Sequence, residues 1–298
     1  MEAGKLSHPG AQLINPKILR FFRFMRNAIF GVGGLRDWSS YFLRRSVYGV
    51  RKAWARPAMV TESGEVETVC HAMEQSGYFA PSAPMLAIDS VVSNMVDIVN
   101  GLIKHSQQKM PDATKTYWVN LNDTLCLSKH DGFVRLLNAL ALMDVATQYL
   151  GDKPVISFVQ LVQTIGSVEN ISSPQASQKW HVDNDDARIF KFFVYLTDVF
   201  STEDGPFSLA PAPLSKQVAR KLLLKLKLRA RIPDKDFLEC LGSKENVVEM
   251  PGKSGAWFVA DTHRCYHFGS RSANNRIALF ATYISRVSLI RPIMNLAS

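Results

Sequence analysis

Hydrophobic positions follow two different periods along the chain, and the change between them predicts the order of the elements. From residue 65 to residue 150 the apolar residues recur at spacings of three and four, which is typical of amphipathic helices. Beyond Pro154 they form short β-branched and aromatic runs bounded by Gly, Pro, Asn and Asp, which predict strands. The expected helices are residues 65–77, closed by Gly77, then 88–103 and 132–150. The expected strands are residues 156–164, 189–196, 245–250, 255–260 and 276–284, with a strand start at 78–80.

Helices followed by strands indicate an α+β domain in which helices pack on an antiparallel barrel or sandwich. One helical stretch interrupts the strands, because Ser215–Leu228 contains the run KLLLKLKL. We expect a helical insertion over about residues 215–242 within a domain formed by residues 61–298. Residues 1–60 are then a separate N-terminal extension.

The charge of the chain is concentrated in that extension. Residues 1–60 contain eleven Lys and Arg but two acidic residues, so they carry the whole net charge of +9. Residues 17–30 have helical periodicity, with apolar side chains on one side and arginines largely elsewhere. Such a segment either packs on the domain with a solvated basic face or lies on an anionic membrane surface, and a mitochondrial-type targeting segment is a third interpretation.

The remaining chain has no net charge, which argues against a nucleic-acid partner because phosphate binding needs a basic stripe near the site. The Lys and Arg residues of 216–231 are a partial counter-argument. Four cysteines without a C-x-x-C pair indicate a reducing compartment. With no secretory signal or apolar run of membrane-spanning length recognised, we expect a cytoplasmic protein. Peripheral membrane contact through residues 17–56 is a further expectation.

Candidate metal ligands lie in the strand region. His181 and Asp183 are two residues apart, so an extended backbone would project both side chains from one face. A downstream histidine, either His263 or His267, would complete a set of two histidines and one carboxylate. That set, with open coordination positions, is expected of non-haem iron(II) oxygenases.

Further motifs appear in a recognisable order around these residues. Region 65–284 resembles the phytanoyl-CoA dioxygenase-like family of iron(II)- and 2-oxoglutarate-dependent oxygenases. The resemblance rests on a helix running into Gly77-Tyr78, Q-x-W-H-x-D at 178–183, the strand and Gly-Pro-Phe turn at 191–207, the glycine-led strand 252–261, His267-Phe268-Gly269 and Arg276.

The resemblance implies a double-stranded β-helix, a jelly-roll or cupin-like barrel with iron at its open end. It implies that His181, Asp183 and His267 bind the metal and that 2-oxoglutarate chelates it. Arg276 would pair with the far carboxylate of 2-oxoglutarate, because a planar guanidinium fork suits that task.

Two further residues and one alternative concern the co-substrate. Lys191 and Tyr195 share strand parity with the ligand pair if the intervening turn keeps register, so either is a candidate contact to 2-oxoglutarate. Arg271 remains an alternative to Arg276 as the partner of its far carboxylate.

The predicted activity is a dioxygenase that hydroxylates a small organic or lipid-like substrate. Oxygen and 2-oxoglutarate would be converted to succinate and carbon dioxide. Asp183 favours hydroxylation over halogenation, because related halogenating enzymes lack this carboxylate. The competing interpretation is a non-catalytic or degenerate barrel that binds a membrane or a protein partner through the basic N-terminal segment.

Overall fold

The computed structural model describes residue 50 and residues 63–105, 117–122, 125–225, 227 and 229–286. The amphipathic segment predicted at residues 17–56 therefore lies, apart from residue 50, outside the described residues. Among the helices that are described, none is both long and apolar enough to cross a lipid bilayer.

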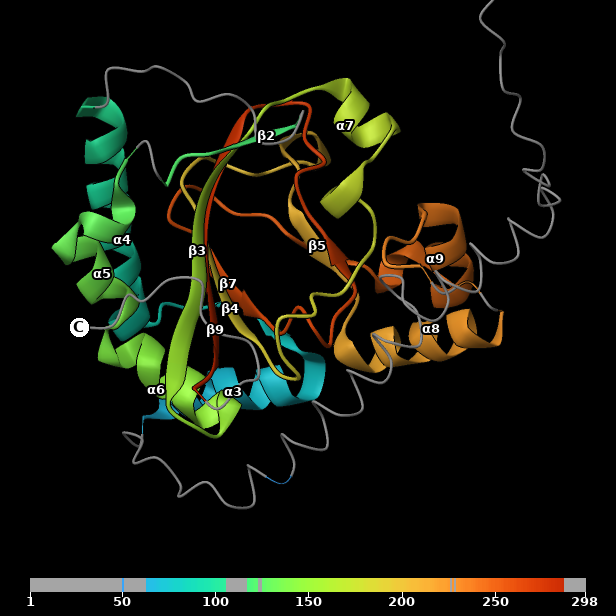
Figure 1. Ribbon diagram of the computed structural model, residues 1–298, viewed down its shortest axis with the longest axis horizontal. Coiled ribbons are helices and arrows are strands. Elements are labelled where there is room, and N and C mark those ends of the chain that lie inside the picture. The colour runs from blue at the N-terminus through green and yellow to red at the C-terminus, as the bar shows by residue number, and fades with distance from the viewer. Residues whose placement is uncertain are drawn as a thin grey trace, which may run out of the picture.

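Two antiparallel sheets form the centre of the molecule (Figure 1). The larger has the order β1-β7-β4-β9-β3-β2 and the smaller has the order β6-β5-β8. The strands of the larger sheet are β1 Tyr78–Phe79, β2 Trp118–Asn120, β3 Pro154–Thr164, β4 Phe190–Tyr195, β7 Trp257–Ala260 and β9 Arg276–Ser285. The strands of the smaller sheet are β5 Phe207–Leu209, β6 Val248–Met250 and β8 His267–Phe268.

Helices cover the outside of both sheets (Figure 1). Those on the larger sheet are α3 Gly64–Ser76, α4 Leu86–His105, α5 Asp131–Leu137 and α6 Leu140–Leu150. Those beside the smaller sheet are α8 Ala212–Leu224 and α9 Asp234–Leu241, and the short helix α7 Val168–Ser172 follows β3. Turns of 3₁₀ helix occur at Leu127–Lys129, Ala176–Gln178, Thr202–Asp204 and Lys244–Asn246. The predicted combination of helices with antiparallel sheets is confirmed.

Alternation along β4 separates two layers of core. Phe192 and its same-face neighbours pack against the helices, in a cluster that includes buried residues of α3, α4 and α6. Phe193 and Tyr195 point the other way, into a cluster shared with the smaller sheet. The rings of Phe193 and Phe207, one from each sheet, lie 4.6 Å apart. The two sheets therefore pack face to face, and side chains of opposite parity on β4 serve different cores.

The predicted helix over 132–150 is wrong in one respect, since the structure breaks it into α5 and α6. The break lies at Asn138 and Ala139, where Ala139 adopts an extended backbone with φ −60° and ψ 140°. The side chain of Asn138 turns back to bond the carbonyl of Val134, an arrangement that competes with helix continuation.

Gly77 fixes how closely α3 approaches the end of β7. It caps α3 with a left-handed backbone, φ +82°, and a Cβ at this position would lie 2.5 Å from Cys265 Sγ. Its carbonyl accepts a hydrogen bond from the backbone of Asp261 at 2.7 Å. Because a side chain would clash here, glycine allows the β7–β8 loop, which leads to His267, to lie against the helix.

Candidate metal centre

An isolated bridge between His181 and His267 brings two distant parts of the chain together. Each backbone amide donates to the carbonyl of the other residue, at 3.0 and 2.9 Å. Residues directly opposite in an antiparallel pair project their side chains on the same face, so both imidazoles point the same way. The two ring centroids lie 4.3 Å apart.

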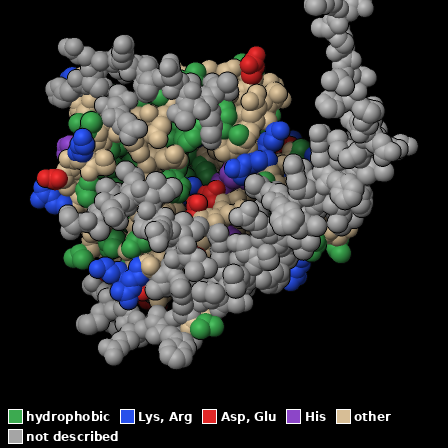
Figure 2. Space-filling model, in the orientation of Figure 1, with side chains coloured by type: hydrophobic (Ala, Val, Ile, Leu, Met, Phe, Trp, Pro, Cys, Tyr) green, Lys and Arg blue, Asp and Glu red, His purple; other side chains and the backbone are tan. Residues whose placement is uncertain are grey.

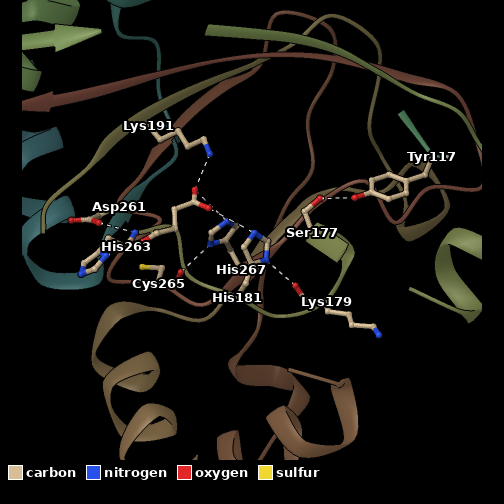
Figure 3. A network of polar contacts seen from close by, with 10 residues as sticks. Tyr117, Ser177, Lys179, His181, Lys191, Asp261, His263, Cys265 and His267 are labelled. Carbon is tan, nitrogen blue, oxygen red and sulfur yellow. Dashed lines mark hydrogen bonds and ion pairs between the residues drawn. The ribbon is translucent and has the colours of Figure 1, made fainter. Parts of the chain in front are cut away.

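Asp183 completes a group of three potential ligands (Figure 3). One carboxylate oxygen lies 3.8 Å from His181 Nε2 and the other lies 3.7 Å from His267 Nε2. One ligand atom from each of the three residues falls within 4.8 Å of the other two. The backbone amide of Asp183 donates to Thr262 at 2.9 Å, which ties its segment to the β7–β8 loop.

Hydrogen bonds at Nδ1 leave the lone pair of Nε2 available on both histidines. His181 Nδ1 lies 2.8 Å from the carbonyl of Lys179, and His267 Nδ1 lies 3.1 Å from that of Cys265. A carbonyl only accepts, so Nδ1 carries the proton and Nε2 is free to ligate. Burial lowers the pKa of His267 to about 4 and holds the pKa of His181 well below its usual range. Both rings are therefore neutral near pH 7, the form that binds metals.

Asp183 is ionised under the same conditions. Burial opposes the charge, but the positive charge of Lys191 and its hydrogen bond outweigh it, so the pKa of Asp183 lies well below its ordinary value. Lys191 Nζ donates to Asp183 Oδ2 at 2.9 Å. Lys191 comes from the inward face of β4, 7% exposed, with its ammonium 4.8 Å from the ring centroid of Phe280. The site thus contains a carboxylate, two neutral imidazoles and one buried cation.

Arg276 opens β9 and is 6% exposed. It donates to the carbonyl of Gly205 and, at 3.5 Å, to Ser270 Oγ. Within the described chain no carboxylate pairs with it, and its Nε has no hydrogen-bond partner. Burial accordingly lowers the pKa of its guanidinium. A buried cation without an acidic partner is expensive, which makes Arg276 a candidate anion-binding group.

The alternative residues for anion binding and for metal ligation, Arg271 and His263, have other partners. Arg271 is engaged by Asp234, with both terminal nitrogens 2.7 to 2.8 Å from its carboxylate oxygens. His263 is outside the ligand group, since its Nδ1 lies 2.9 Å from the backbone carbonyl of Asp183. His263 thus supports the segment that carries Asp183.

Tyr195 faces the interior between the sheets, but its hydroxyl is already used. It donates to the carbonyl of Met250 at 2.8 Å and accepts from the amide of Phe207 at 2.9 Å. These bonds join β4 to the smaller sheet. The contact to a co-substrate predicted for Tyr195 stays a prediction, and its ring, 5.7 Å from the Arg276 guanidinium carbon, is the part available for it.

A second buried polar network, absent from the sequence prediction, stands behind the site. Asp261 is fully buried and accepts from Tyr149 at 2.6 Å and from the backbone amides of His263 and Arg264, both at 3.1 Å. Arg264 also donates to the Tyr149 hydroxyl at 3.1 Å. Asp261 thus fixes the turn that positions His263. Its place directly after a predicted strand is the one signal that the sequence offered.

The ligand group is reached from one face of the molecule. Figure 2 shows acidic and histidine atoms together in the hollow at the centre of this face, with Lys or Arg atoms beside them. The side chain of Asp183 is 18% exposed, whereas those of His181 and His267 are each 5% exposed. Asp183 is therefore the most exposed of the three candidate ligands.

Comparison with known proteins finds similarity in structure alone. EctD from S. alaskensis, solved with 2-oxoglutarate and 5-hydroxyectoine, superposes with a TM-score of 0.51 at 17% identity, covering 80% of this chain and 82% of that chain. The chain shares its fold with EctD. A second structure of EctD, with bound Fe, has a TM-score of 0.51 at 16% identity and covers 79% of this chain and 82% of that chain. No family model matches the sequence, and no curated protein matches it.

Proposed function

We propose that the chain is an iron(II)- and 2-oxoglutarate-dependent dioxygenase built on a double-stranded β-helix. The observation that carries the proposal is the convergence of His181, Asp183 and His267 from separate segments onto one face. Two neutral imidazoles and one carboxylate form the facial ligand set typical of non-haem iron(II), with the remaining positions left open. The EctD structures, which hold Fe or 2-oxoglutarate, support the proposal by analogy of fold.

The donor atoms fit such a metal. The carbonyl partners of His181 and His267 fix each ring with Nε2 toward Asp183, which is the outer-shell arrangement that orients ligating imidazoles. The low pKa of Asp183 supplies a carboxylate, so one net charge of a divalent ion would be neutralised by the protein. When bound, iron(II) supplies oxygen activation, and the protein supplies binding, orientation and exclusion of water.

The inner face of β9 fits a polar co-substrate. Arg276 and Thr282 have the same parity on this strand, and each has a buried polar atom without a partner among the described residues, Nε and Oγ1 respectively. We propose that Arg276 binds the far carboxylate of 2-oxoglutarate, since a guanidinium fork matches a carboxylate. Lys191 and Tyr195, on the neighbouring strand β4, are proposed as further contacts to 2-oxoglutarate. Lys191 would share its ammonium between Asp183 and the co-substrate.

The proposed reaction is hydroxylation of a small organic or lipid-like substrate, with 2-oxoglutarate and O2 converted to succinate and CO2. Asp183 supports this outcome over halogenation, because its carboxylate takes up the coordination position that a halide would need. The buried aromatic side chains between the sheets exclude water from the reacting centre, which limits unproductive reactions.

We further propose that residues 61–298 form the oxygenase domain and that residues 1–60 are an extension that contacts anionic membrane surfaces. Their net charge of +9 and their aromatic residues support this role. The expected location is the cytoplasm, with peripheral membrane contact through residues 17–56.

Succinate formation tests the proposed function. Purified full-length protein, reconstituted anaerobically with iron(II), should form succinate from 2-oxoglutarate after oxygen is admitted, even slowly and without substrate. His181→Ala and Asp183→Ala should each abolish this reaction. Arg220→Ala, at an exposed position of α8, is the control and should retain it. Full turnover in either ligand variant would refute the assignment.

A further inference from the structure

Arg231 lies next to the candidate metal ligands although it comes from the helical insertion. An isolated antiparallel bridge pairs Trp180 with Ile232, and the amide of Ile232 donates to the carbonyl of Trp180 at 2.8 Å. In an antiparallel pair the next residue on one segment faces the previous residue on the other. The bridge therefore sets Arg231 opposite His181, which itself faces His267 in the adjoining bridge.

The chain neighbours of His181, His267 and Arg231 pack together in one apolar cluster. Trp180 and Ile232 belong to the apolar cluster beneath α8 and α9, where the ring of Trp180 stacks on Phe237 at 3.9 Å. Phe268, next to His267, packs on the edge of the same cluster, 4.6 Å from Trp180. His181 and His267 each adjoin a residue of this cluster and project to the opposite face, and Arg231 directly precedes Ile232.

Arg231, His181 and His267 thus lie side by side on three adjacent segments. The electrostatic effects agree with this placement. After burial, the positive charge of Arg231 is among the influences that lower the pKa values of His181 and His267, and Asp183 in turn favours its charged form.

Arg231 is exposed and, within the described chain, forms neither an ion pair nor a hydrogen bond. Two lysines of the insertion and one arginine of the β8–β9 loop, in contrast, are engaged by carboxylates. Lys225 and Lys227 pair with Glu239 at 2.7 and 3.0 Å, and Arg271 pairs with Asp234. The charge of Arg231 is therefore available to a molecule that enters the site.

Two hydroxyl groups lie on one side of the histidine pair. Tyr117 and Ser177 hydrogen-bond each other at 2.8 Å and lie on one side of the histidine pair, while Lys191 lies on the other (Figure 3). Tyr117 is also among the groups that act electrostatically on Arg231. A cation with hydroxyl groups nearby is suited to an oxyanion.

We propose that Arg231 anchors an anionic group, a carboxylate or a phosphate, of the organic substrate at the mouth of the site. The Tyr117–Ser177 hydroxyl pair provides neighbouring hydrogen bonds. That the bound molecule is a substrate rests on the proposed function. The anion site itself follows from the position of Arg231 beside His181 and His267. Arg276 is separate from it, because it is buried at the start of β9 and is proposed to hold the co-substrate.

Ligand-observed NMR with matched probes tests this site. The full-length chain is loaded with cobalt(II) in place of iron and saturated with 2-oxoglutarate, so that Arg276 is occupied. Hexanoate and hexyl phosphate are the anionic probes, which separates the two sources of charge, and hexanamide and hexanol are their neutral counterparts. Saturation transfer measures Kd with or without cobalt, and cobalt-induced relaxation of the probe protons reports proximity to the metal.

At least one anionic probe should bind near the cobalt and more tightly than its neutral counterpart. Arg231→Met should weaken that binding by about tenfold to a hundredfold, the range for a charge-assisted hydrogen bond. Arg231→Lys should retain part of it. Arg220→Met, which removes an exposed charge from α8, should leave it unchanged.

The proposal is overturned if wild-type protein binds neither anion, if neutral probes bind equally well, or if Arg231→Met has no effect. It is also overturned if Arg231→Met weakens 2-oxoglutarate binding instead. These outcomes are distinct from failure of the proposed function. Arg231-dependent anion binding without cobalt uptake or succinate formation would reject the oxygenase and keep the anion site, and the reverse result would reject the anion site alone.

Discussion

Replacing Tyr149 with phenylalanine tests whether the network around Asp261 supports the site. The hydroxyl of Tyr149 donates to Asp261 at 2.6 Å and accepts from Arg264 at 3.1 Å. Both Tyr149 and Asp261 are at most 1% exposed, so water cannot replace the lost group without rearrangement. Hydrogen bonds to charged groups contribute about 1.5–3 kcal/mol. We expect Tyr149→Phe to lower the free energy of unfolding by about 2 kcal/mol at pH 7.5.

The pH dependence of that loss separates a bond to a carboxyl from loss of packing. Burial raises the pKa of Asp261, and the Tyr149 hydrogen bond partly offsets the rise. Between the pKa of the unfolded chain, about 3.9, and the raised folded value, the folded state holds a proton that the unfolded state has lost. Stability from this group therefore falls as pH rises through that window. Removing the hydroxyl raises the folded pKa of Asp261 further, so the destabilisation should shrink as pH is lowered through that window.

Urea denaturation of wild type and variant at several pH values measures the effect. Tyr283→Phe is the matched control, because this buried hydroxyl donates at 2.7 Å to the backbone carbonyl of Leu137, which does not titrate. It should lower the free energy of unfolding by about 1 kcal/mol at every pH. Equal losses in the two variants, or a loss in Tyr149→Phe that does not change with pH, would refute the reasoning.

Three other predictions concern the co-substrate, the metal and the extension. Arg276→Met should raise the Kd for 2-oxoglutarate, measured calorimetrically on cobalt-loaded protein, by about tenfold to a hundredfold; an unchanged Kd would contradict its role. His263→Leu should weaken cobalt binding about tenfold, as loss of a group that orients a metal ligand typically does. His263→Asn keeps a hydrogen-bond donor near the Nδ1 position and should retain the affinity for cobalt. Equal losses of affinity in the two variants would contradict the hydrogen-bond explanation. Changing Arg20, Arg23 and Arg26 to Gln should reduce sedimentation with anionic vesicles, and unchanged sedimentation would contradict the membrane proposal.

The sequence predicted the main helices and long strands because their apolar periods persist over many residues. β3 and β9, for example, carry enough alternation to be recognised. β5 and β8 have three and two residues, too few for a periodic signal. The break between α5 and α6 depends on one backbone angle at Ala139, which propensity does not resolve.

The candidate ligands were predicted from spacing and resemblance, and the structure brings His181, Asp183 and His267 together, while their roles stay predictions. Sequence left His263 and Arg271 as alternatives, since only tertiary contacts show that one supports Asp183 and the other is paired with Asp234. Nothing in the sequence indicated that Arg231 lies near the candidate ligands. Its place depends on a bridge between residues 52 positions apart.

The central claim is that these three side chains bind one metal ion. Crystals of the full-length protein grown anaerobically with iron(II) and 2-oxoglutarate, measured on both sides of the iron absorption edge, test it most directly. The account predicts one strong anomalous peak bounded by Nε2 of both histidines and the Asp183 carboxylate, at about 2.0–2.2 Å from each by analogy with other divalent metal sites. An iron peak at another position, or density for 2-oxoglutarate without iron beside these residues, would contradict it.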